Sequence, residues 1–160
     1  MLEHRLKIYN IITIVLAFLE FILFLCIPFV NIDGSTAQQV GAYIIASCFW
    51  CCISAECVFI YLTAKIRKSL SKKDFHSRTL KYAYPGIFSF FKNKEAIIVD
   101  IVLYASAIIL MIIVWVRVKN EWVVMINYSV FFLAFNLHCI LNGKNYRYLK
   151  QYRTYKKENE

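Results

Sequence analysis

The stretch GAYIIASCFWCCISAECVFIYLTA, residues 41–64, contains a single formally charged residue, Glu56, and four of the six cysteines. A helix of about 20 residues is long enough to cross the ~30 Å hydrocarbon core of a bilayer. This stretch exceeds that length and has no Lys or Arg. The sequence therefore predicts a membrane span here, and Glu56 is the residue that the span has to accommodate.

The rest of the 160-residue chain has the composition of a membrane protein. It is 60% hydrophobic, whereas soluble domains are about 45–50% apolar. The apolar residues fall in four blocks, at about 8–30, 40–64, 96–116 and 122–141. The first block is longer than the ~7–15 residue apolar region of a signal peptide, so we expect an uncleaved span. We predict one all-α domain, a polytopic membrane protein whose four transmembrane helices form an up-down bundle.

The segments outside the blocks are polar and basic, and they include a long connector at 65–95 and a tail at 142–160. Residues 66–80 have mixed charge and are predicted to extend the second span as a helix, and the Tyr-Pro-Gly at 84–86 is predicted to be a break. Residues 87–96, IFSFFKNKEA, and the tyrosine-rich tail combine aromatic with basic residues. That combination is typical of short helices in the headgroup layer, so we expect both to be cytoplasmic surface segments.

The distribution of Lys and Arg predicts the orientation. Of the nineteen, only Arg117 and Lys119 lie between the third and fourth blocks, and the other seventeen lie before the first block, in the connector or in the tail. The positive-inside rule then places both termini and the connector in the cytoplasm, and we expect the plasma membrane. Trp115 and Trp122 flank the short outer turn, as interfacial aromatic residues do. Anionic lipid headgroups, rather than nucleic acid, are the expected partners of the net charge of +9.

Each predicted span carries one strongly polar ionisable residue: Glu20, Glu56, Asp100 and His138. Such residues are costly in lipid and usually face the interior of a bundle or water. At a rise of ~1.5 Å per residue, the last three lie in the inner half of the membrane, and Glu20 lies about one and a half turns higher. We expect those three to meet, either as a site for an ion or ligand or as a packing contact. The Glu-x-x-His spacing of di-iron bundles is absent, so no metal site and no cofactor is predicted.

The cysteines of the second block have two interpretations. Cys48 and Cys51 form a C-x-x-C, the motif of thiol oxidoreductases, but the predicted loops contain no cysteine that could relay electrons to it. Small residues at four-residue spacing also allow helices to approach closely in lipid. We predict that helix packing is their role, and the predicted packing residues are Ser47, Cys48, Cys51, Cys52 and Ala55.

Three classes of function follow from these features. The chain has no Gly-rich phosphate loop, no H-E-x-x-H and no G-x-S-x-G, so we predict no catalytic residues. We interpret it as a small integral membrane protein that acts by intramembrane interaction, as an accessory subunit or an immunity-type protein. Its partner would be another membrane protein or a second copy of itself. The alternative is an oligomeric small transporter or channel that uses the four ionisable residues for protons or cations. A membrane thiol oxidoreductase is the third class.

Overall fold

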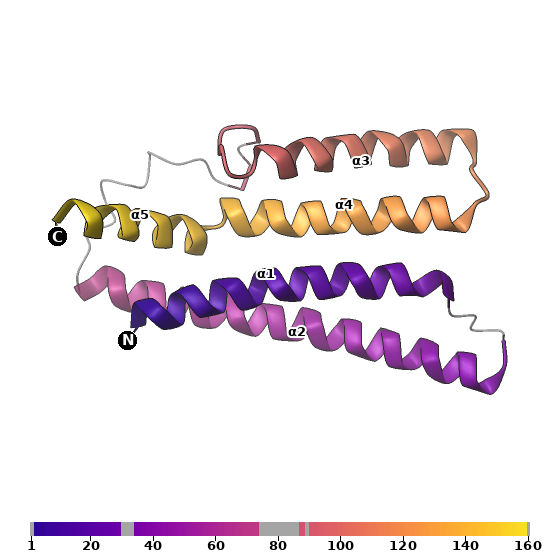
Figure 1. Ribbon diagram of the computed structural model, residues 1–160, viewed down its shortest axis with the longest axis horizontal. Coiled ribbons are helices and arrows are strands. Elements are labelled where there is room, and N and C mark those ends of the chain that lie inside the picture. The colour runs from indigo at the N-terminus through magenta and orange to yellow at the C-terminus, as the bar shows by residue number, and fades with distance from the viewer. Residues whose placement is uncertain (1, 30–33, 74–86, 89, 160) are drawn as a thin grey trace.

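The computed structural model describes residues 2–29, 34–73, 87–88 and 90–159 (Figure 1). Within them the regular secondary structure is helical, and α1 to α4 are each long and apolar enough to cross a membrane. The four predicted spans are thereby confirmed as helices of that kind. The elements are α1 (Leu2–Cys26), a short 3-10 turn η1 (Ile27–Phe29), α2 (Thr36–Lys73), α3 (Ile97–Val116), α4 (Glu121–Asn142) and α5 (Lys144–Asn159).

The connector is described only in part. α2 continues to Lys73, which confirms the predicted helical extension of the second span that far. The remainder of that extension and the break predicted at 84–86 lie outside the described residues. The bounds of α2 show that this helix is much longer than the ~20 residues that a bilayer requires. Its last turns therefore have room to project beyond the apolar core at the end where the chain termini lie (Figure 1).

Local chemistry sets the other helix ends. Pro28, which lacks a backbone N–H, follows the end of α1 and lies in η1. Arg117 ends α3 in the left-handed region, with φ of 55°, and its N–H donates to the carbonyl of Val114 at 3.3 Å. The side chain of Asn120 then caps α4, because its Oδ1 accepts the backbone N–H of Trp122 at 3.1 Å. These two caps make the connection between α3 and α4 short and well defined.

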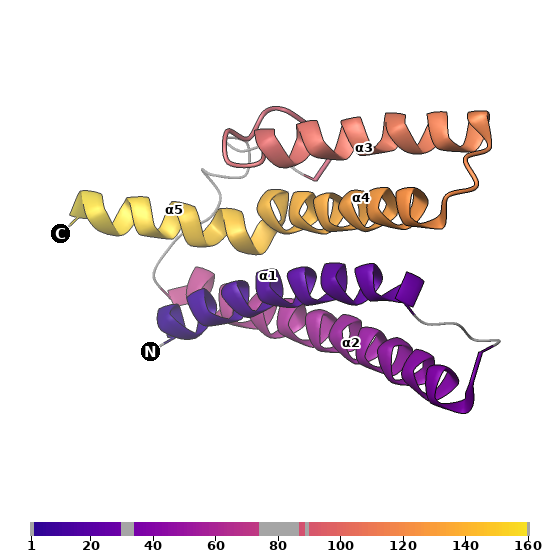
Figure 2. The same ribbon diagram turned by 45° about the vertical axis from the view of Figure 1, so that its right-hand side comes forward.

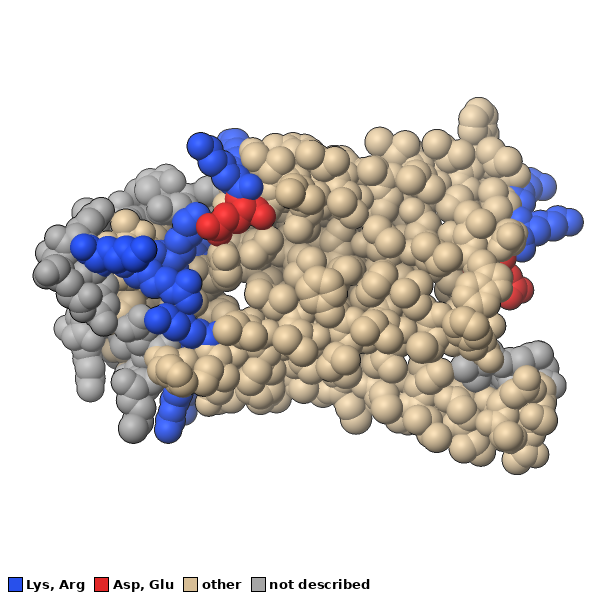
Figure 3. Space-filling model, in the orientation of Figure 1, with Lys and Arg blue, Asp and Glu red and all other residues tan. Residues whose placement is uncertain are grey.

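The helices lie side by side in the order α2, α1, α4, α3 (Figures 1 and 2). α1 packs against both α2 and α4, and α3 packs against α4. Across the described residues, α2 and α3 have no extensive contact with each other. Large apolar side chains are exposed along all four long helices, as expected for surfaces that face lipid. On the face drawn in Figure 3, charged side chains lie at the two ends and the zone between them is uncharged.

A small apolar core joins α5 to the beginning of α1 and the end of α2. Leu6 is fully buried against Tyr148 and Leu149, and Ile66 and Tyr152 pack around them. The tail, predicted as a surface segment, is the helix α5, and its apolar side chains pack against α1 and α2. Its place at the membrane surface stays a prediction.

Candidate functional site

The four ionisable residues of the spans form two separate pairs. Glu20 meets Glu56, and Asp100 meets His138. All four side chains are buried. Of the three residues expected to meet, Asp100 and His138 do so. Glu56 pairs with Glu20 instead, because α2 and α3 lie at opposite ends of the row of helices. The fold places Glu20 next to Glu56. The depth estimated from the rise per residue had put Glu20 about one and a half helical turns farther from the inner side of the membrane.

The Asp100–His138 pair binds the chain segment that precedes α3. Nδ1 of His138 lies 2.5 Å from Oδ1 of Asp100, and Nε2 of His138 lies 2.6 Å from the carbonyl oxygen of Ile87. The other oxygen of Asp100 accepts the backbone N–H of Phe91 at 2.7 Å. The ring of Phe90 stacks on the imidazole at a centroid distance of 4.3 Å. Since a carbonyl only accepts hydrogen bonds, Nε2 carries a proton here.

Two asparagines extend this contact. Nδ2 of Asn142 donates to the backbone carbonyl of His138 at 3.1 Å, and Nδ2 of Asn93 donates to Oδ1 of Asn142 at 3.3 Å. The described residues of 87–96 are thereby held against α3 and α4. The backbone of this segment satisfies buried polar groups of two spans, and its place in the headgroup layer stays a prediction. Phe91 has a left-handed φ of 59°, and the Asp100 hydrogen bond holds it in that conformation.

The Glu20–Glu56 pair differs from the first because its hydrogen-bonding capacity is not all used. The two carboxyl groups are buried next to each other, where two negative charges would repel. Nδ2 of Asn136 donates to Oε2 of Glu20 at 3.0 Å. Oε1 of Glu20 is buried without a hydrogen-bond partner among the residues that the structure describes. A buried oxygen of this kind costs free energy unless another group binds it.

Glu56 also lines an open groove of about 430 Å³. The walls come from α1, α2, α4, the beginning of α5 and Ile87. Lys144 lies at the α5 end of the groove, and the uncharged polar side chains in its walls are Asn10, Thr13, Thr63, Asn136 and Asn145. The groove thus has mainly apolar walls with polar side chains among them, and its acidic residue is Glu56.

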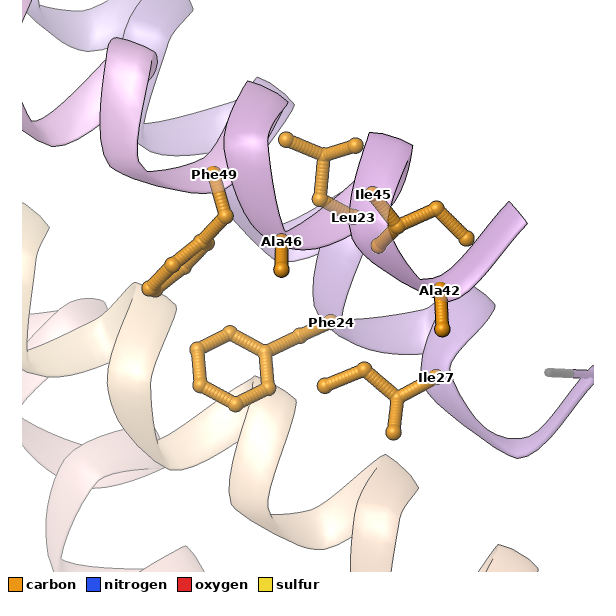
Figure 4. Close-up of a pocket in the computed structure, with 7 residues that line it drawn as sticks. All are labelled: Leu23, Phe24, Ile27, Ala42, Ile45, Ala46 and Phe49. Carbon is orange, nitrogen blue, oxygen red and sulfur yellow. The ribbon is translucent and has the colours of Figure 1, made fainter. Parts of the chain in front are cut away.

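A second cavity, of about 170 Å³, lies between α1 and α2 near the opposite end of these helices (Figure 4). Its lining is aliphatic or aromatic throughout: Leu23, Phe24, Ile27, Ala42, Ile45, Ala46 and Phe49. Figure 4 shows Phe24 and Phe49 close together, and their rings meet edge to face with centroids 4.9 Å apart. With no polar group in its walls, this cavity suits hydrocarbon rather than a polar ligand.

The predicted packing residues of α2 lie mostly on its outer side. Ser47, Cys48 and Cys51 are exposed, and Cys52 and Ala55 are half-buried. The exposed three thus do not pack between helices of this chain. Cys48 and Cys51 of the C-x-x-C are free thiols, as are the other four cysteines.

A further contact joins α5 to the beginning of α3. Nζ of Lys150 lies 2.8 Å from Oε1 of Glu95, and both side chains are 40% exposed. Tyr146 hydrogen-bonds to the same Glu95, and burial together with that carboxylate raises the pKa of Tyr146. An exposed ion pair of this kind contributes at most about 1 kcal/mol. The contact supports the position of α5 without determining it.

Sequence reasoning gave no role to Asn136 or Asn10, although both contribute to the groove. An amide side chain within an apolar span was the signal that could have identified them, because an unpaired amide is costly in lipid. Among the described residues, no three His, Cys, Asp or Glu side chains come together as a metal site. Comparison of the chain with protein-family models, with curated proteins and with solved structures gave no match.

Proposed function

We propose that the chain is a multi-pass protein of the cell membrane that acts by binding within the bilayer, as an accessory subunit or an immunity-type protein. Its helices cross in up-down order with both termini in the cytoplasm. The charge distribution supports this orientation, since only two of the nineteen Lys and Arg residues, Arg117 and Lys119, lie in the short connection between α3 and α4.

The observation that carries the proposal is the exposed face of α2. Among the long helices, α2 packs extensively against α1 alone, and its outer side presents Ser47, Cys48 and Cys51. Small side chains at this spacing let a second helix approach closely, and in lipid that close packing is what drives helix association. A transmembrane helix of another membrane protein is the partner that fits such a face.

Co-purification from native membranes in mild detergent tests this function. We expect a membrane protein to accompany the tagged chain, and the double variant Ser47→Leu/Cys51→Leu to lower its recovery about tenfold, which corresponds to ~1.4 kcal/mol of lost packing. Met111→Leu, at an exposed position of α3, is the matched control. A second, differently tagged copy of the chain reports self-association. Recovery of the chain alone, or of proteins insensitive to the double variant, would refute the proposal.

A second candidate function is the movement of protons or cations, and the Glu20–Glu56 pair favours it. Two neighbouring buried carboxyl groups, one of which borders a groove, provide groups that can exchange protons within an apolar layer. Purified protein in liposomes should then carry a proton or cation flux that Glu56→Gln abolishes. The control is Glu121→Gln, which changes an exposed acid at the beginning of α4. A flux unaffected by Glu56→Gln removes this function.

A further inference from the structure

We propose that the groove beside Glu56 is a binding site for a primary ammonium group carried on a small apolar body. The proposal rests on the second candidate function and names the cation that the site would take. It is argued from the hydrogen-bond donors and acceptors in the walls of the groove.

The hydroxyl protons of the groove are already used within the chain. Oγ1 of Thr13 donates to the carbonyl oxygen of Tyr9 at 2.8 Å, and Oγ1 of Thr63 donates to that of Phe59 at 2.5 Å. A hydroxyl has one proton and two lone pairs. Both threonines therefore face a ligand only as hydrogen-bond acceptors.

The asparagines of the groove also use their donor atoms within the chain. Nδ2 of Asn10 donates to the carbonyl oxygen of Leu6 at 2.9 Å, and Nδ2 of Asn145 donates to that of Ile60 at 3.2 Å. Nδ2 of Asn136 donates to Glu20. Because a backbone carbonyl cannot donate, these bonds fix which end of each amide is nitrogen. The amide oxygens are left without a partner in the described part of the chain.

The carboxyl group of Glu56 completes an acceptor-rich wall. It is 9% exposed and borders the groove directly, whereas Glu20 is fully buried beside it and does not line the groove. The carboxyl group of Glu56 is the acidic group of the groove lining, and Lys144, the one basic side chain among the described residues of that lining, lies at its α5 end. A single positive charge that brings several N–H donors balances both the charge and the acceptors.

The apolar part of the lining determines the rest of the ligand. Ile60, Ile87 and Ile140 stand among the polar groups, and the groove volume of about 430 Å³ is within the range of small-molecule sites. A short alkyl chain fits those side chains, and an –NH₃⁺ group supplies three donors. A trimethylammonium group has the same charge but no N–H, so it leaves the acceptors unpaired. An alkali cation has no apolar body to bury.

The test measures binding of n-hexylammonium, hexyltrimethylammonium and sodium to the full chain in phosphatidylcholine nanodiscs, by calorimetry, with empty nanodiscs subtracted. We expect saturable binding of hexylammonium, at least about tenfold weaker binding of its trimethyl analogue, and no competition by sodium. Thr63→Val should weaken hexylammonium binding about tenfold. Thr154→Val is the matched control, since Thr154 makes the same backbone hydrogen bond in exposed α5. Glu56→Gln should abolish binding, with helicity measured by circular dichroism to verify folding.

Equal affinity for the two hexyl amines, competition by sodium, or an unchanged Thr63→Val variant would overturn the proposal. The liposome flux measurement distinguishes failure of the amine site from failure of the second candidate function, the movement of protons or cations. A proton or sodium flux that needs Glu56, in a protein that binds no hexylammonium, leaves the second candidate function standing and removes the amine site. Absence of both Glu56-dependent flux and amine binding removes both.

Discussion

At the scale of single residues, the pairs Asp100–His138 and Glu20–Glu56 differ in their hydrogen-bond partners, and this difference distinguishes a structural role from a binding role. Asp100 and His138 use their polar atoms on each other and on the backbone of 87–91. Glu20 keeps a buried oxygen without a partner among the described residues, and Glu56 lines a groove. Both pairs are costly to bury, but only the second has capacity left for a ligand.

The first prediction concerns the Asp100–His138 pair. Removing one member leaves the other buried and unpaired, so Asp100→Leu should lower the free energy of unfolding by about 3 kcal/mol. Thermal unfolding in detergent micelles measures the change, with Glu121→Gln as the exposed control. The double variant Asp100→Leu/His138→Leu should lose less than the sum of its single variants. Strict additivity would show that the two side chains do not act as a pair.

At the scale of helices, the junction of α4 with α5 depends on Gly143. A Cβ atom at this position would lie 2.8 Å from the carbonyl oxygen of Cys139 and 3.0 Å from that of Ile140. Both are backbone atoms of α4 and cannot move without disturbing the helix. The absence of a side chain thus permits the direction in which α5 leaves α4, and that direction brings Tyr148 and Leu149 onto Leu6.

The second prediction follows from this junction. Gly143→Ala should force α5 away from α1 and α2 and lower the free energy of unfolding by about 1–3 kcal/mol. Limited proteolysis after Lys and Arg should then cleave Lys144–Asn159 faster than in the original chain. Gly41→Ala, inside α2, is the control and should stabilise the helix slightly. Cleavage of α5 at the original rate would contradict the role given to Gly143.

At the scale of the whole molecule, the charges and the row of helices determine how the chain sits in a bilayer. Exposed apolar side chains along α1 to α4 suit lipid, and the basic residues concentrate at the end that holds the termini. The groove is lined in part by Lys144 and Asn145 at the start of α5, so it belongs to that same end. In the proposed orientation, a ligand of this site would enter from the cytoplasm.

The third prediction tests this orientation. In a background with all six cysteines changed to serine, Lys119→Cys should react with a membrane-impermeant maleimide added to intact cells. Lys157→Cys, at an exposed position in α5, should react only after the membrane is permeabilised. Labelling of Lys157→Cys in intact cells would reverse the proposed orientation and the proposed direction of entry to the groove.

Several features could be predicted from the sequence because they depend on neighbours along the chain. The existence of four apolar helices follows from block length and hydropathy alone, and the end of the first near Pro28 follows from its missing N–H. The burial of Glu20, Glu56, Asp100 and His138 also followed, since an ionisable side chain in a span avoids lipid.

Only the tertiary structure decided which of these side chains meet. Depth along a helix is a local property, but contact between helices depends on their order, and hydropathy does not encode an order of α2, α1, α4, α3. That order pairs Glu20 with Glu56 and leaves Asp100 and His138 to bind the segment before α3. It also leaves the cysteine-bearing face of α2 exposed, where the sequence alone predicted packing. The sequence determined the helices and the charge at their ends, and long-range packing determined the site, because a buried polar group binds whichever partner the fold brings within reach.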